Sequence, residues 1–232
     1  MESKTLSVHL DELRSLLLRL LIIWGGATLL VSFYTAPLLN FLLKPYGEGV
    51  SSTFLLLSPL EGWWTAFFVA MLGGALFALP LILLFLIAYL LPALYPDEGK
   101  KVIFVSGFIA LFSFLGFFVG HYQFAPFMIK ALQENIAVPG IPAYTLREAL
   151  HFVVSIDMGV MVLFNLMGGL LIAVLKGWIL PETLASWRRP YILGAFIAGA
   201  ILTPPDVLSQ VLMAGALIIG FEAVLFFGRF LK

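Results

Sequence analysis

The sequence contains no cysteine and few charged side chains. Without cysteine there can be no disulfide, no zinc–thiolate site and no thiol catalysis. Only 11% of the 232 residues are charged, thirteen of each sign, and the zero net charge provides no attractive field for nucleic acid. Soluble domains have about 25% charged residues. This chain therefore has too little polar surface to enclose a water-soluble core.

Apolar residues are abundant instead, at 62% of the chain, and the mean hydropathy is +1.07. A typical soluble domain is about 45–50% apolar. Disorder is excluded because disordered segments are poor in apolar residues. The composition predicts an integral membrane protein, and we expect one all-α membrane domain over residues 1–232 in contact with the lipid bilayer.

The charged residues separate long uncharged runs, including 24 residues between Arg19 and Lys44 and 35 between Glu61 and Asp97. A helix needs about 20 apolar residues to cross a bilayer. The second run is too long for a perpendicular crossing, so we expect a bend at Gly73-Gly74 and Pro80. We predict six spans, the last two short, at approximately residues 16–36, 63–92, 102–126, 149–175, 190–203 and 207–228.

Lysine and arginine predict the orientation. With an even number of crossings, both termini share a side that carries ten of these residues, and the other side carries three. The three are Lys44, Lys130 and Arg147. Both termini are therefore expected in the cytoplasm.

Motifs for enzymatic chemistry are absent from the sequence. There is no P-loop, no Gly-x-Ser-x-Gly and no His-Glu-x-x-His. The three histidines lack metal-ligand spacing. We therefore predict a protein that is not an enzyme and needs no metal or cofactor.

Ionisable residues inside apolar segments are candidates for function. Asp157 lies about two turns into the fourth segment, where it could reach water on the outer side. Glu222 must face protein or a water-filled cavity, or be protonated. For His121 we expect a hydrogen bond between helices rather than a proton relay.

Carboxylates also occur at two places on the expected cytoplasmic side. Leu6, Leu10, Leu13 and Leu17 form an apolar stripe, which predicts a helix along the interface before the first span. Asp11 and Glu12 lie on its other faces, and Asp97 and Glu98 lie in the first cytoplasmic loop. Solvated loop charges are one reading. The other is a site for a ligand with two guanidinium groups, which carboxylates bind in a bidentate manner.

Three stretches in order resemble the TatC subunit of the twin-arginine translocase. Residues 9–17 read HLDELRSLL, residues 92–98 read PALYPDE, and an RPY at 189–191 precedes LTPPDVLSQ at 202–210. The family pattern in the first stretch is His-Leu-x-Glu-Leu-Arg-x-Arg-Leu. Each motif alone is weak, but the ordered set spans nearly the whole chain.

The resemblance implies a receptor that binds twin-arginine signal peptides of folded cargo and a core scaffold for export driven by the proton-motive force. Its partners would be the single-span subunits TatA and TatB and other TatC copies. Carried over by position, Glu12 and Glu98 would bind the signal peptide and Arg14 would order the N-terminal helix. The residues implied in partner binding and assembly are Pro204, Pro205, Asp206 and Gln210.

Some positions depart from the family pattern. The usual Phe-Glu-x-Pro of the fourth segment is here residues 164–167, FNLM, so neutral Asn165 replaces a glutamate. Asp157 lies eight residues earlier, about 80° around the helix, and is no simple substitute. Two alternatives stay open. One is a small proton-coupled secondary transporter that uses Asp157, Glu222 and His121, and the other is a family member that assists assembly without binding signals.

Overall fold

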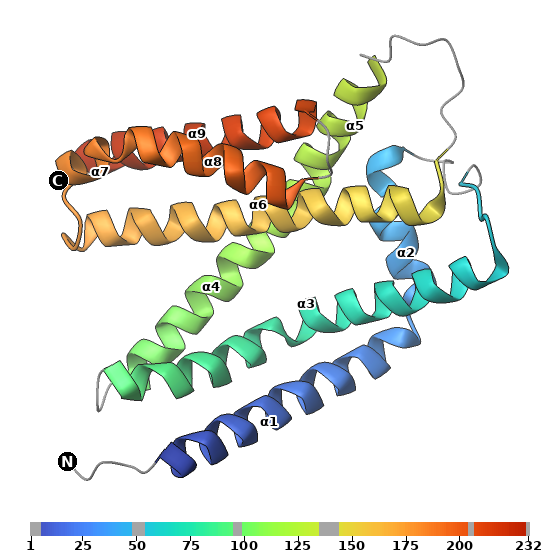
Figure 1. Cartoon of the computed structure of the whole chain (residues 1–232), viewed down its shortest axis with the longest axis horizontal. Coiled ribbons are helices and arrows are strands. Elements are labelled where there is room, and N and C mark those ends of the chain that lie inside the picture. The colour runs from blue at the N-terminus through green and yellow to red at the C-terminus, as the bar shows by residue number, and fades with distance from the viewer. Residues whose placement is uncertain (1–5, 48–53, 95–98, 135–143, 204–206, 231–232) are drawn as a thin grey trace. The chain divides into compact units, whose positions relative to one another are not determined.

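The computed structural model describes residues 6–47, 54–94, 99–134, 144–203 and 207–230. Regular structure in these ranges is helical, apart from one parallel β-bridge between Leu55 and Thr145 (Figure 1). The elements are α1 (Leu6–Ser32), α2 (Thr35–Leu43), the 3₁₀ turn η1 (Lys44–Tyr46), α3 (Pro59–Leu94), α4 (Gly99–Val119), the π-helical turn η3 (Gly120–Phe124), α5 (Ala125–Glu134), α6 (Leu146–Leu175), α7 (Pro181–Ser186), α8 (Arg188–Leu202) and α9 (Val207–Phe230).

Five helical stretches in the described part of the chain are long and apolar enough to cross a membrane. They are Asp11–Ser32, Pro59–Tyr89, Ile103–Glu134, Leu146–Leu175 and Val207–Phe230. The all-helical membrane architecture expected from the sequence is confirmed. α8 has 15 residues, about 22 Å of helix against about 30 Å of hydrocarbon, so a sixth crossing stays a prediction.

The first helix differs from the expected interfacial helix followed by a separate span. α1 runs without a break for 27 residues, from Leu6 to Ser32. No proline or glycine interrupts residues 6–24, so nothing in that stretch stops helix propagation. The charged side chains of Arg14 and Arg19 are exposed along it.

The third helical segment was expected to end at Pro126, and it continues to Glu134. Proline removes one helical hydrogen-bond donor and crowds the preceding turn. The π-helical turn η3 accommodates this, because the N–H of Ala125 bonds to the carbonyl oxygen of Gly120, five residues earlier. The helical path therefore extends through α4, η3 and α5.

The last helix is not short. α9 has 24 residues, which corresponds to about 36 Å and is enough to cross a bilayer. Glu222 does not end the apolar segment, because its carboxylate has a cationic partner and the helix continues to Phe230. Of the two segments expected to be short, only α8 is.

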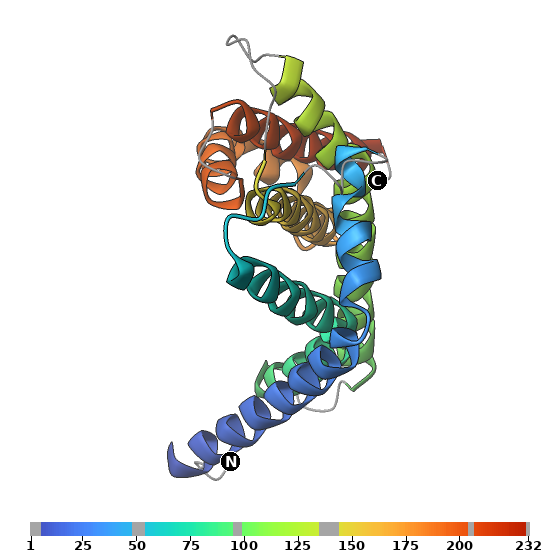
Figure 2. The same cartoon turned by 90° about the vertical axis from the view of Figure 1, so that its right-hand side faces the viewer.

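Contacts divide the chain into two compact units, and each is described by itself. The first comprises Met1–Phe41 and Leu56–Leu111. α1 and α3 pack along each other within it (Figure 2). The indole N–H of Trp24 on α1 donates to the carbonyl oxygen of Met71 on α3 at 3.1 Å.

Gly73 and Gly74 allow the close approach of these two helices. A Cβ at Gly74 would lie 2.6 Å from the Cα of Thr28 on α1, and one at Gly73 would lie 2.8 Å from Cγ1 of Val31. Neither position has room for a side chain. The glycine pair, at which the sequence suggested a bend, thus has a packing role within a helix that runs from Pro59 to Leu94.

The second unit comprises Leu42–Leu55 and Phe112–Lys232. α6 packs against both α8 and α9, and α8 packs against α9. A glycine again sits at a close approach, since a Cβ at Gly199 on α8 would lie 2.9 Å from the carbonyl oxygen of Gln210 on α9. The buried core includes Leu163, Met167, Val174, Leu184, Leu217, Phe221 and Leu225.

Local signals set both ends of α6. Thr145 and Glu148 form a reciprocal capping box at its start, and Gly177 takes a positive φ of 72° just after its end. Beside the first turn, the hydroxyl of Tyr46 lies 3.4 Å from the carbonyl oxygen of Ala149. Burial raises the pKa of Tyr46, so the phenol keeps the proton that it donates to this bond.

The packing of α1 on α3 predicts opposite outcomes for two glycines of one helix. Gly74→Ala should destabilise the protein by about 1–3 kcal/mol, because the new methyl group forces the two backbones apart. Gly62→Ala is the matched control, since nothing lies within 4 Å of its Cβ position. It should be neutral or stabilising by up to about 1 kcal/mol. Denaturant unfolding in detergent measures both, and equal effects would contradict the packing role.

Candidate functional site

The residues expected to bind a signal peptide lie in or after the first helix. Glu12 is half-buried and Arg14 is exposed on α1, and two residues of separation place them on different faces of the helix. The hydroxyl of Ser15 donates to the backbone carbonyl of Glu12 at 2.8 Å. Glu98 falls outside the described residues, so the distance between the two carboxylates stays a prediction.

His121 and Asp157 form a buried pair inside the second unit. Nδ1 of His121 lies 3.0 Å from Oδ2 of Asp157, and both side chains are 0% exposed. The second carboxylate oxygen of Asp157 has no hydrogen-bond partner among the described residues. The hydrogen bond expected for His121 is present, whereas Asp157 does not reach outer water because it is fully enclosed.

The π-helical turn places the imidazole for this contact. His121 lies within η3, whose wider turn follows from Pro126. Gly120 faces α6 so closely that a Cβ would lie 3.0 Å from the Cα of Asp157. The ring of His121 is also parallel to that of Phe117, with centroids 6.0 Å apart. A glycine, a proline and two ionisable residues therefore build one junction.

Asn165 makes two hydrogen bonds from its side-chain amide. Nδ2 donates to the hydroxyl of Ser113 on α4 and to the carbonyl oxygen of Met161, each at 2.9 Å. Its buried Oδ1 has no partner among the described residues. The neutral residue thus links α6 to α4 as a hydrogen-bond donor.

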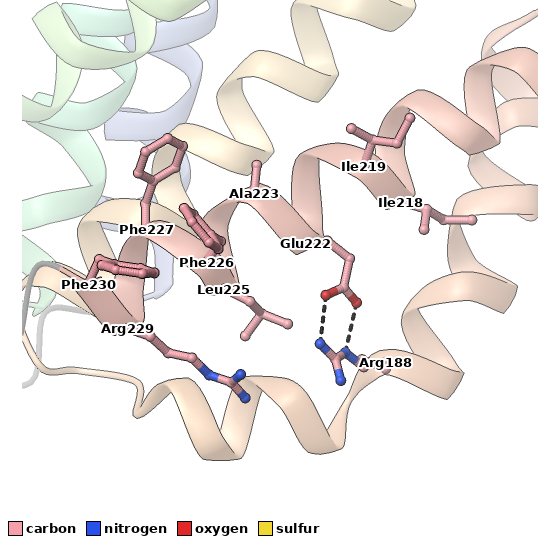
Figure 3. A pocket seen from close by; sticks show the side chains of 10 residues that line it. All are labelled: Arg188, Ile218, Ile219, Glu222, Ala223, Leu225, Phe226, Phe227, Arg229 and Phe230. Carbon is pink, nitrogen blue, oxygen red and sulfur yellow. Dashed lines mark hydrogen bonds and ion pairs between the residues drawn. The ribbon is translucent and has the colours of Figure 1, made fainter.

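Glu222 and Arg188 form a bidentate ion pair between α9 and α8. Nε donates to Oε1 at 2.7 Å, and Nη2 donates to Oε2 at 2.6 Å. The two side chains are 45% and 46% exposed, and they border an open pocket of about 650 Å³ (Figure 3). The sequence left open whether Glu222 faces protein, faces a cavity or is protonated. In the structure it faces a cavity and has an arginine as its partner.

The hairpin of α8 and α9 contains the last group of candidates. The side-chain amide of Gln210 donates to the carbonyl oxygen of Phe196 on α8 at 3.2 Å. Near the end of α8, the hydroxyl of Thr203 donates to the carbonyl oxygen of Gly199 at 2.7 Å. Pro204, Pro205 and Asp206 lie outside the described residues.

The structure thus pairs some candidates and separates others. His121 and Asp157 were each identified from the sequence, but their pairing was not. Arg188 as the partner of Glu222 was missed, because 34 residues separate the two in the sequence. The sequence signal that could have found this pair is the lone acidic residue in an apolar helix, because such a residue needs a cationic partner. Among the described residues, no group of three or more His, Asp or Glu side chains could hold a metal ion.

These helices and their partnered polar residues define a multi-pass helical membrane protein. Residues 8–215 match the sequence profile of the family described as Sec-independent protein translocase protein (TatC). The chain belongs to the TatC family. It is therefore a component of a protein translocase and not an enzyme.

Bacterial relatives match almost the whole chain. The TatC protein of Escherichia coli is 29% identical over 99% of this chain and 90% of its own length. That of Aquifex aeolicus is 31% identical, with 97% and 94% covered. Two crystal structures of the twin-arginine translocase receptor TatC have TM-scores of 0.78 and 0.77 at 27% identity, and cover 95% and 96% of this chain and 99% of theirs. These matches indicate a multi-pass protein of the inner membrane.

The buried His121–Asp157 pair predicts strong energetic coupling. Asp157→Leu should destabilise the protein by about 3–5 kcal/mol, because it removes the carboxylate that is bonded to a buried imidazole. Combining His121→Phe with Asp157→Leu should recover most of this loss, because neither polar group is then left alone. A double-mutant cycle on these variants and the single variants, read by unfolding in detergent, measures the coupling.

His151→Phe is the control, because His151 is an exposed histidine on α6 whose bond within the described part of the chain is local, to Ser155. It should change the free energy of unfolding by no more than about 0.5 kcal/mol. Simple additivity of the single substitutions at 121 and 157 would contradict the coupling.

Proposed function

We propose that this protein is the membrane receptor and core scaffold of a twin-arginine translocation complex. It would bind the signal peptides of folded cargo proteins for export driven by the proton-motive force. The observation that carries this proposal is the family match over residues 8–215, which includes the acidic motif of α1. Family membership also favours a translocase over a small proton-coupled carrier.

The proposed topology has six crossings in one membrane domain, with both termini in the cytoplasm. Five long apolar helices support it, with α8 as a short additional crossing. The distribution of lysine and arginine, ten residues against three, supports the orientation. A thinner bilayer around α8 would accommodate its length.

The proposed signal-peptide site uses the carboxylates of Glu12 and Glu98. Each can accept two parallel hydrogen bonds from an arginine, which a lysine cannot reproduce because its ammonium is a point charge. Arg14 would order the N-terminal helix that carries Glu12. The half-buried position of Glu12 supports this role, because a partly desolvated carboxylate binds a cation more strongly than a fully solvated one.

The proposed partners are TatA, TatB and other copies of this chain. The short α8 and its hairpin turn would form the assembly region, with Pro204, Pro205, Asp206 and Gln210. The exposed apolar residues of α8, including Leu193, Ile197 and Ile201, are compatible with contact to a single-span helix. We also propose intramembrane roles for Asn165, Asp157 and Glu222 in holding this scaffold together.

Signal-peptide crosslinking tests the receptor function. A twin-arginine peptide with a photoreactive group should label the chain in membrane vesicles, and Glu12→Gln or Glu98→Gln should each weaken binding about 10- to 100-fold. This range follows from about 1.5–3 kcal/mol for a charge-assisted hydrogen bond. Replacing the arginine pair of the peptide with lysines should have a comparable effect.

Glu134→Gln is the matched control, because this exposed glutamate on α5 pairs with Lys130 and belongs to no proposed site. It should leave labelling unchanged. Labelling that is insensitive to both glutamate substitutions and to the arginine-to-lysine change would overturn the receptor proposal.

A further inference from the structure

The pocket between the start of α8 and the end of α9 combines apolar walls with two arginines. Its volume is about 650 Å³. Figure 3 shows Arg188 and Arg229 with their guanidinium groups on the same side of α9 and Leu225 between them. The apolar lining is Ile218, Ile219, Ala223, Leu225, Phe226, Phe227 and Phe230.

The charge of this pocket is positive. Arg188 and Glu222 neutralise each other through two hydrogen bonds, and Nη1 of Arg188 makes none with the described residues. Arg229 is exposed and forms no ion pair or hydrogen bond within the described part of the chain. One uncompensated guanidinium charge and the two N–H groups of Nη1 of Arg188 therefore border the same open volume.

The position of the pocket corresponds to the edge of a bilayer. Arg188 is the first residue of α8, and Arg229 lies in the last turn of α9, a helix long enough to span the membrane. Trp187, directly before Arg188, is 62% exposed. Tryptophan is enriched at the level of lipid headgroups. The arginines and the apolar walls of the pocket thus meet at the level where a lipid headgroup joins its acyl chains.

We propose that this pocket binds an anionic phospholipid. The phosphate would accept hydrogen bonds from Arg229 and from Nη1 of Arg188, and an acyl chain would lie on Phe226 and Phe230. Glu222 would position Arg188 without contacting the lipid. This binding is independent of the proposed receptor function, because it needs no signal peptide.

Other ligands would match only one of the two features of the pocket, which are its positive charge and its apolar walls. A small soluble anion would neutralise Arg229 but leave the aromatic walls uncovered. An apolar helix would cover the walls but bury an unpaired guanidinium, which is costly. A zwitterionic lipid brings no net charge to compensate the pocket. An anionic phospholipid matches both features.

Native mass spectrometry of the full chain tests the proposal. The delipidated protein should retain phosphatidylglycerol more strongly than phosphatidylcholine. Arg229→Gln should weaken phosphatidylglycerol binding about tenfold or more and leave phosphatidylcholine binding unchanged. This variant should fold normally, because Arg229 has no partner in the described structure.

Arg189→Gln is the control, because Arg189 is exposed on α8 beside Arg188 but does not line the pocket. It should change phosphatidylglycerol binding less than about twofold, which corresponds to the effect of one screened surface charge. Equal losses in the two arginine variants, equal retention of both lipids by the unaltered protein, or displacement of the lipid by inorganic phosphate alone would each overturn the proposal.

Discussion

A charged or polar side chain in a hydrocarbon environment needs a partner, and this requirement organises the second unit. Asp157 is paired with His121, Glu222 with Arg188, and the amide of Asn165 with Ser113. Each contact joins two helical elements through residues that are 36, 34 and 52 positions apart in the sequence, respectively. Because an unpaired charge in such an environment is costly, the pairs restrict which helices can lie together and in which register. Their value is specificity of arrangement as much as stability.

Close backbone approach provides the complementary constraint. In the first unit Gly74 admits the backbone of α1, and in the second unit Gly120 admits that of α6 beside Asp157. Lipid offers no hydrophobic gain for helix association, so membrane helices depend on van der Waals contact at small residues and on interhelical hydrogen bonds. At Gly120 both occur within one turn, because the residue that permits the approach precedes the histidine that makes the hydrogen bond.

The sequence could predict what depends on composition and local pattern. Long uncharged runs predicted the membrane helices, and the ordered motifs predicted the family. Pairings such as Glu222 with Arg188 could not be predicted, because 34 residues separate them and no local pattern encodes their register. The prediction that the third helical segment ends at Pro126 was wrong for a related reason. Pro126 normally stops a helix, but a π-helical turn absorbed it, and that depends on how η3 packs on α6.

The acidic residues Asp157 and Glu222 of the membrane helices differ in their exposure, but each is bonded to an internal partner. Asp157 is enclosed and bonded to His121, so it does not substitute for the glutamate of the family pattern at position 165. Asn165 keeps a polar contact there without a charge. Glu222 is half-exposed, yet both of its oxygens are bonded to Arg188. Asp157 and Glu222 are thus both committed to internal partners. The proposed recognition of a cationic peptide therefore depends on carboxylates outside this set, such as that of Glu12 near the start of α1.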